Sequence, residues 1–144
     1  MNYLVALDFS HSTTPVLQTV ANLAIKKKDK IWLIHVAQPN PALAGYEAGP
    51  DAVRGQVAEE YKREHKEIQR QAGRLREDGY DVTALLIRGP VVKTILAAAK
   101  KHQADMIVMG SHGHSAVYQI LVGSISEGVL HRAPCPVLLV PPEK

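Results

Sequence analysis

Cysteine, aromatic residues and long apolar runs are all scarce in this chain. Cys135 is the single cysteine among 144 residues, so no disulfide can form within one copy. One Phe and one Trp leave little aromatic surface for stacking on nucleic-acid bases. No apolar run approaches the ~20 residues that span a bilayer, and the opening MNYLVAL lacks the basic region of a secretory signal. We therefore expect a cytoplasmic protein that neither inserts into a membrane nor binds nucleic acid.

The rest of the composition is that of an ordinary globular domain. Hydrophobic residues make up 46% of the chain and charged residues 22%, which is enough apolar side chain for one core. The length of 144 residues predicts a single domain spanning 1–144. The formal net charge of +3 mildly favours anionic ligands. The charges at 59–78 mix both signs, as on a solvated helix face.

Short apolar runs alternate with helical patterns along the chain. The runs are nearly continuous, as in parallel strands covered on both faces; they lie at 3–7, 30–36, 81–87, 105–109 and 136–140. Four helical patterns lie between or after these runs. The first opens at Thr14-Pro15 and closes in the lysines 26–28, and the second runs from Val57 to Gly79. The third starts after Gly89-Pro90, and the fourth ends before Pro134. This alternation predicts a Rossmann-like three-layer α/β/α sandwich around a doubly wound, five-stranded parallel sheet of order 3-2-1-4-5.

A ligand crevice is expected at the carboxyl edge of this sheet, where the first and fourth strands meet and the winding reverses. That arrangement brings 6–12 and 109–115 to the same crevice. The segment 37–51, rich in Pro, Gly and Ala, follows the second strand. It is either a lid over the crevice or an ordinary surface connection.

The segment 109–126, MGSHGHSAVYQILVGSIS, contains three glycines and two histidines after an apolar run. It is not a P-loop, since no lysine lies between Lys101 and Lys144. The dinucleotide fingerprint is also excluded, because that pattern needs a glycine-rich turn after the first strand, where this chain reads DFS. Gly110 and Gly113 would let the backbone turn sharply and approach a ligand.

A helix start at the end of this segment indicates anion binding. The tetrapeptide SISE at 124–127 predicts a capping box, with Ser124 as the N-cap and Glu127 at the third helical position. The first-turn N–H groups of such a helix, with the hydroxyls of Ser124 and Ser126, suit a phosphate. One short helical turn at 116–121 would return the chain to the crevice. The segment therefore predicts a phosphate clamp in two parts.

The spacing Gly110-x-x-Gly113, nine residues and then Gly123-Ser124 resembles the nucleotide-binding motif of the universal stress protein family. The resemblance continues in YLVALDFSHS at the start, ADMIVMGSHGHS in the fourth strand and loop, and LVGSISEGVLHRAPCPVLLVP at the end. It implies ATP or AMP as ligand, with Mg²⁺ near Asp8 and the phosphates. It also implies a homodimer paired through the last strand, 136–140, which would cover a sheet edge.

The resemblance further implies roles for individual residues. Asp8 would hold the ribose, and the backbone at Ala6 and Val36 would meet the adenine. Met109 and Gly110 would flank the base and sugar. Gly113, Gly123, Ser124 and Ser126 would wrap the phosphates, with Ser10 near them or near Mg²⁺. The complete set of candidate binding residues is Ala6, Leu7, Asp8, Ser10, Val36, Met109, Gly110, His112, Gly113, His114, Gly123, Ser124, Ile125 and Ser126.

His112 and His114 stand where members of that family often carry Arg or Lys. Because an unperturbed histidine is mostly neutral above pH ~6.5, phosphate affinity is expected to be weaker and to rise in acid. We hypothesise that His112 contacts the phosphates.

Other functions of the same residues are weighed against nucleotide binding. A zinc site from His11, His112, His114 and His131 lacks the close ligand spacing and the completing cysteine or acid that zinc prefers. Catalysis could use Asp8, Ser10, His11 and His112 as nucleophile and base, but the chain lacks a nucleophile elbow, so at most slow ATP hydrolysis is expected. A third possibility is an interaction module that docks on a client protein, such as a transporter, through 37–56 and the charged second helix. We expect a nucleotide-responsive stress-response dimer, with a slow ATPase and an interaction module as the alternatives.

Overall fold

A computed structural model describes residues 1–38, 51–113 and 122–143, without the side chains of 51–54. Residues 39–50 of the segment 37–51, which was expected to be either a lid or a surface connection, lie outside the described residues, as do the helical turn at 116–121 and His114. The elements follow the predicted order: β1 Asn2–Ala6, α1 Thr13–Leu23, β2 Lys30–Ala37, α2 Asp51–Glu77, β3 Asp81–Arg88, α3 Val91–Lys101, β4 Met106–Gly110, α4 Ser124–Arg132 and β5 Val137–Val140.

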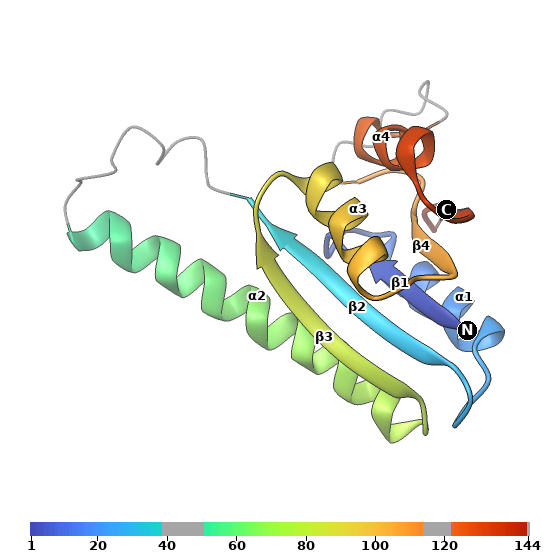
Figure 1. Ribbon diagram of the computed structural model, residues 1–144. Coiled ribbons are helices and arrows are strands. Elements are labelled where there is room, and N and C mark those ends of the chain that lie inside the picture. Colours follow the sequence, from blue (N-terminus) through green and yellow to red (C-terminus); the bar gives the residue numbers. More distant parts are fainter. Residues whose placement is uncertain (39–50, 114–121, 144) are drawn as a thin grey trace.

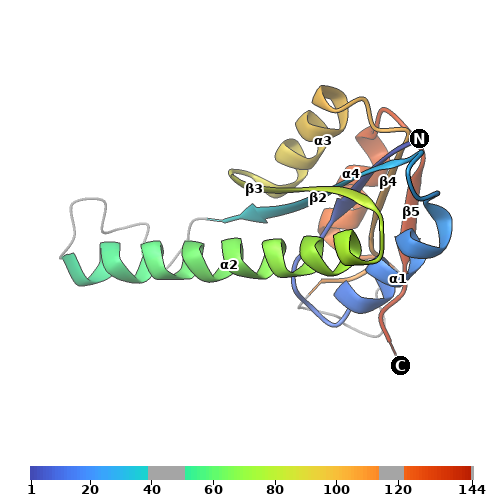
Figure 2. The same cartoon turned by 90° about the horizontal axis from the view of Figure 1, so that it is seen from below.

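The five strands form one parallel sheet in the order β3-β2-β1-β4-β5, which confirms the predicted topology (β1 to β4 are labelled in Figure 1 and β5 in Figure 2). β1 lies in the middle, with Leu4 opposite Trp32 of β2 and Ile107 of β4. The strand order reverses between β1 and β4, so the ends of these two strands define the crevice that such sheets use for ligands.

Helices cover both faces of the sheet and bury two separate cores (Figures 1 and 2). Successive strand residues point to opposite faces, so Val5 joins the core under α1 and α2 while Leu4 joins the core under α3 and α4. Both residues are fully buried. The near-continuous apolar character of the strands follows from this double coverage.

The helix boundaries differ from the predicted ones in two places. α1 begins at Thr13 after the N-cap Ser12, so Pro15 is its third residue, and the helix ends at Leu23. The lysines 26–28 therefore lie in the turn beyond the helix and not in its last turn. α2 begins at Asp51, six residues before Val57, and has 27 residues. Figure 2 shows it running along β2 and then beyond the end of that strand.

Within the described ranges, no helix combines the length and the apolar character that crossing a membrane requires.

Candidate functional site

A cavity of about 850 Å³ opens at the carboxyl edge of the sheet, where β1 and β4 separate. This volume is typical of small-molecule sites. The loop after β1, the end of β2, the start of α3, the loop after β4 and the first turn of α4 all contribute to its lining. Segments that are more than a hundred residues apart in sequence thus meet at one site, as the strand order predicts.

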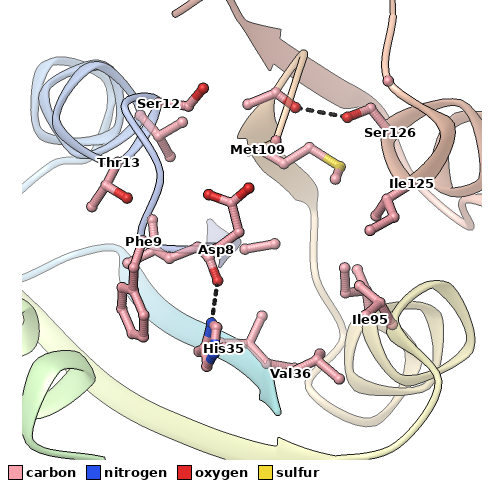
Figure 3. Close-up of a pocket in the computed structure, with 18 of the residues that line it drawn as sticks. Asp8, Phe9, Ser12, Thr13, His35, Val36, Ile95, Met109, Ile125 and Ser126 are labelled. Carbon is pink, nitrogen blue, oxygen red and sulfur yellow. Dashed lines mark hydrogen bonds between the residues drawn. The ribbon is translucent and has the colours of Figure 1, made fainter. Parts of the chain in front are cut away.

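One wall of the cavity is apolar. Val36, Ile95, Met109 and Ile125 project into it from β2, α3, β4 and α4 (Figure 3). Val36 and Met109 are buried side chains, whereas Ile125 is 39% exposed. Such a wall suits a flat, weakly polar group such as an aromatic heterocycle.

Asp8 is the carboxylate beside this wall, and the surrounding backbone fixes its direction (Figure 3). Its Oδ1 accepts a hydrogen bond of 2.9 Å from the Ser10 N–H. Its Oδ2 lies 2.8 Å from the point where a Cβ on Gly113 would stand. Phe9, between Asp8 and Ser10, has φ of 60°, which is uncommon for a residue with a side chain.

Close approach between two loops explains why Gly110 and Gly113 are glycines. A Cβ on Gly110 would lie 2.7 Å from Ser12 Cβ, and one on Gly113 would meet the Asp8 carboxylate. The Ser12 hydroxyl also donates a 3.0 Å hydrogen bond to the His112 carbonyl. The missing side chains therefore let the loop after β4 pack against the loop after β1, which places both beside the cavity.

The predicted capping box is wrong. Gly123, and not Ser124, is the N-cap of α4, and no side chain caps the helix. The Gly123 N–H donates to the Ser111 carbonyl at 2.7 Å, and the Glu127 N–H donates to the Gly123 carbonyl at 2.9 Å. The loop after β4 thus holds the chain so that Ser124 is already helical. The first-turn N–H groups still have no acceptor within the helix, as anion binding requires.

The two serines of this turn differ in what their hydroxyls do. Ser126 is 4% exposed, and its hydroxyl donates a 2.8 Å hydrogen bond to the Gly110 carbonyl (Figure 3). That proton is committed to fastening α4 to the end of β4 and is not offered to a ligand. Ser124 is exposed at the rim of the cavity.

The remaining predicted residues are divided between the cavity and its supports. Ala6, Leu7 and His112 line the cavity. His112 Nδ1 lies 2.9 Å from Ser111 Oγ. Ser10 is not among the lining residues, and its hydroxyl accepts a 3.2 Å hydrogen bond from the Ser12 N–H. Ser10 therefore shapes the loop that carries Asp8.

The cavity also contains residues that were not among the individually predicted binding residues. Phe9 and Ser12 lie within the segment 6–12 that was expected at the crevice, and His35 adjoins the predicted Val36, so their chain position is a usable signal. Glu60 and Glu64 come from α2, and only tertiary packing brings them to the cavity. The complete unpredicted set is Phe9, Ser12, Thr13, Val16, Ile34, His35, Gln38, Glu60, Glu64, Val91 and Ile95.

A zinc site finds no support among the described residues, where no three His, Cys, Asp or Glu side chains cluster in a way that could hold a metal. His11 and His131 are both exposed. His131 Nε2 lies 3.5 Å from Glu127 Oε1 on the same helix.

Fold and cavity together define the class: a Rossmann-like α/β protein with a ligand cavity at the strand-order reversal, beside a helix N-terminus. The model of the universal stress protein family matches residues 1–141. The chain belongs to this family.

Individual relatives agree with this assignment. Universal stress protein A homolog 2 of Coxiella burnetii (strain RSA 493 / Nine Mile phase I) is 35% identical over 141 residues, covering 95% of this chain and 92% of that protein. The solved structure of MJ0577 from Methanocaldococcus jannaschii matches with a TM-score of 0.84 at 26% identity, covering 99% of this chain and 96% of that chain.

Two further solved structures carry a bound nucleotide. An Arabidopsis thaliana family protein with AMP bound has a TM-score of 0.69 at 17% identity, covering 99% of this chain and 92% of that chain. A universal stress protein in complex with cAMP has a TM-score of 0.64 at 20% identity, covering 99% and 98%. Because both sequence identities are low, these two structural matches show a shared fold and nothing about the ligand of this chain.

Proposed function

We propose that this chain binds an adenine nucleotide, AMP or ATP, and acts as a nucleotide-responsive regulator in the stress response. One observation carries the proposal: an apolar wall, a fixed carboxylate and a helix N-terminus line the same cavity of about 850 Å³. These are the groups that a base, a ribose and a phosphate chain need. The AMP and cAMP bound to two proteins of the same fold support this choice of ligand.

Each part of the nucleotide has a matching part of the cavity. The adenine would lie against Val36, Met109 and Ile125, with the backbone of Ala6 and Leu7 at its edge. Asp8 would accept hydrogen bonds from the ribose hydroxyls. The phosphates would meet the backbone of Gly110, Gly113 and Gly123, the first turn of α4 from Ser124 to Ser126, and His112.

Mg²⁺ is compatible with this arrangement. The ion keeps several waters and is usually held by one or two carboxylates together with phosphate oxygens. Asp8 supplies one such carboxylate next to the glycine loop. The ion would therefore lie near Asp8 and the phosphates, and the charge of the ion would neutralise that of the phosphates. Ser10 would act on this site through the loop, by keeping Asp8 in place.

The proposal extends to a cytoplasmic homodimer paired through β5. The sheet ends at β5, whose outer edge has no neighbouring strand within the described residues. An edge strand presents unpaired backbone groups, and pairing with a second copy is one way to satisfy them.

The direct test is to release small molecules from freshly purified protein by heat and identify them by mass spectrometry. We expect an adenine nucleotide. Calorimetric titration with AMP, ATP and GMP then compares affinities, and GMP should bind more weakly than AMP. If no adenine nucleotide is recovered and neither AMP nor ATP binds at millimolar concentration, the proposal is wrong.

Two variants of the experiment separate the alternatives. His112→Ala should lower the affinity for ATP more than the affinity for adenosine if His112 contacts the phosphates. Release of phosphate from bound ATP, above the rate in buffer, would favour a slow ATPase over a binding protein.

A further inference from the structure

His35 is held on three sides at the edge of the cavity. Its Nδ1 lies 2.7 Å from the Leu7 carbonyl oxygen (dashed line in Figure 3). Its ring stacks on Phe9, with centroids 4.2 Å apart and planes inclined by 26°. Its Nε2 lies 3.4 Å from Glu64 Oε2 of α2. The His35 side chain is 12% exposed, so most of its surface is covered.

The contact with Leu7 assigns the proton on the imidazole ring. A backbone carbonyl can only accept a hydrogen bond, so Nδ1 must carry the hydrogen. The Leu7 N–H in turn donates to the Ile34 carbonyl at 2.9 Å. Both backbone groups of Leu7 are therefore tied to β2, although Leu7 lies one residue beyond the end of β1. The His35 side chain thus prolongs the link between the two strands past the end of the regular ladder.

Glu64 limits the freedom of the ring from the other side. Its Oε2 is buried and has no hydrogen-bond partner among the described residues. The distance of 3.4 Å to His35 Nε2 is longer than a good hydrogen bond, so Glu64 restricts the rotation of the ring by contact and does not form a strong bond with it. An ionised carboxylate only accepts hydrogen bonds, so a bond at Nε2 would need a second hydrogen on the ring; the contact with the Leu7 carbonyl alone assigns the hydrogen to Nδ1.

The residues held by His35 are those next to Asp8. Leu7 precedes Asp8 and Phe9 follows it, and Phe9 has the uncommon φ of 60°. We propose that His35 is a positioning residue for the nucleotide site: its hydrogen bond to Leu7 and its stacking on Phe9 fix the turn that directs Asp8 toward Gly113 and the ligand. This inference rests on the proposed function, since nucleotide affinity is what the turn would control.

The test compares His35→Asn with His35→Leu. The Asn amide nitrogen can take the place of Nδ1 and donate to Leu7, whereas Leu cannot, and both variants lose the ring that stacks on Phe9. His35→Leu should weaken AMP binding about 10-fold, and His35→Asn should recover most of that loss. Thermal unfolding of both variants is measured alongside. If the two variants bind AMP equally well, the hydrogen bond does not position the site and the inference fails.

Glu64→Gln provides a variant that keeps the ring intact. The Gln amide can donate to a neutral Nε2, which preserves the donor at Nδ1. In the nitrogen NMR spectrum, Glu64→Gln should therefore keep the hydrogen on His35 Nδ1. Loss of that hydrogen in Glu64→Gln would mean that the charge of Glu64, and not the Leu7 carbonyl, assigns it, and would overturn the inference.

Nitrogen NMR of the imidazole in ligand-free protein separates this inference from the proposed function. The spectrum should show a hydrogen on His35 Nδ1. If that hydrogen is absent, the inference is wrong even where AMP binds. If the hydrogen is present and the unchanged protein binds no AMP, the proposed function fails and the positioning role fails with it, while the assigned geometry of the ring stands.

Discussion

The methyl group that glycine lacks decides how closely the two loops of the site approach each other. A Cβ on Gly113 would lie 2.8 Å from Asp8 Oδ2, closer than real Cβ atoms come to an oxygen. Gly113→Ala is therefore expected to displace the carboxylate and to weaken AMP binding about 10-fold, roughly the loss of one good polar contact. Calorimetric titration with AMP measures the change.

Gly73→Ala is the matched control for this substitution. A Cβ at Gly73 would meet no atom within 4 Å, and the residue lies inside α2. Because Ala is the better helix former by about 1 kcal/mol, the variant should be more stable and bind AMP as the unchanged protein does. Equal AMP affinity in Gly113→Ala and Gly73→Ala would show that the close approach at Gly113 is not needed for binding.

Ser126 and Ser124 give a second contrast at the level of single residues. Ser126→Ala leaves the Gly110 carbonyl without the donor seen at 2.8 Å in a buried position. We expect it to lower the free energy of unfolding by about 1–3 kcal/mol. Ser124 is exposed, so Ser124→Ala should change stability by less than ~0.5 kcal/mol. Urea unfolding measures both, and similar losses would contradict the role assigned to Ser126.

The sequence predicts which residues lie at the cavity better than it predicts which groups their side chains contact. Gly113, Gly123 and Ser126, which were expected to wrap phosphates, all line the cavity. The Ser126 hydroxyl was nevertheless expected to face a phosphate, and it bonds to Gly110 instead. The acceptor of the Ser126 hydroxyl lies 16 residues earlier in the sequence, and a local sequence pattern does not predict which distant carbonyl a hydroxyl will reach.

At the scale of elements, α3 is fastened to the sheet through a titratable ring. His102 is the C-cap of α3 and stacks on Trp32 of β2, with centroids 4.0 Å apart and planes inclined by 24°. Burial, and then the charge of Lys101, lowers the pKa of His102 below its ordinary value. The folded protein therefore takes up this proton less readily than the unfolded chain.

This shift has a definite sign in a measurement of stability against pH. The stabilisation from a neutral His102 is fully present above the unfolded pKa of about 6.5 and is lost as pH falls from there toward the lower folded pKa. His102→Phe keeps a ring against Trp32 and cannot titrate. Its free energy of unfolding should fall less between pH 7 and pH 5 than that of the unchanged protein, as measured by urea unfolding at each pH.

His65→Gln serves as the control for that series. His65 is exposed on α2, which packs on the other face of the sheet from α3, so its replacement should leave the contact between α3 and β2 unchanged. If His102→Phe and the unchanged protein lose the same stability between pH 7 and pH 5, protonation of His102 does not loosen the contact between α3 and β2.

The strands were easier to predict than the helix ends. Each predicted strand ends within one residue of the observed bounds, because burial on both faces imposes an apolar run that stops where the strand stops. The predicted start of α4 at Gly123-Ser124 is confirmed, but the predicted Ser124 cap is wrong, because a tertiary hydrogen bond from Gly123 to Ser111 helps to make Gly123 the N-cap. The first turns of α2 extend beyond the sheet (Figure 2), and only Ala52 and Val53 are apolar among the six residues before Val57.

At the scale of the whole molecule, the cavity depends on both cores. Leu7 and Val16 belong to the core under α1 and α2, whereas Val36, Ile95 and Met109 belong to the core under α3 and α4. The site therefore lies where the two cores meet at the sheet edge. The sequence did not predict Glu60 and Glu64 as cavity residues, because α2 brings them there only by packing along β2 and β3.

The outer edge of β5, which has no neighbouring strand in the part of the chain that the structure describes, is where the proposed dimer would form. On its inner side, the N–H groups of Ile107 and Ser111 donate to the carbonyls of Pro136 and Val140. Backbone groups of successive strand residues point to opposite sides, so the Leu139 N–H is directed to the open edge. A proline at that position removes the outward donor and leaves the pairing with β4 intact, as edge strands tolerate.

Leu139→Pro is accordingly expected to convert the proposed dimer to a monomer, and Leu139→Ala, which keeps the N–H, to leave it dimeric. Sedimentation velocity at micromolar concentration measures both masses. Because Leu139 is not among the residues that line the cavity, the monomeric variant should bind AMP as the unchanged protein does. A Leu139→Pro variant that remains dimeric would place the interface elsewhere. An unchanged protein that is already monomeric would remove the dimer from the proposed function while leaving nucleotide binding untouched.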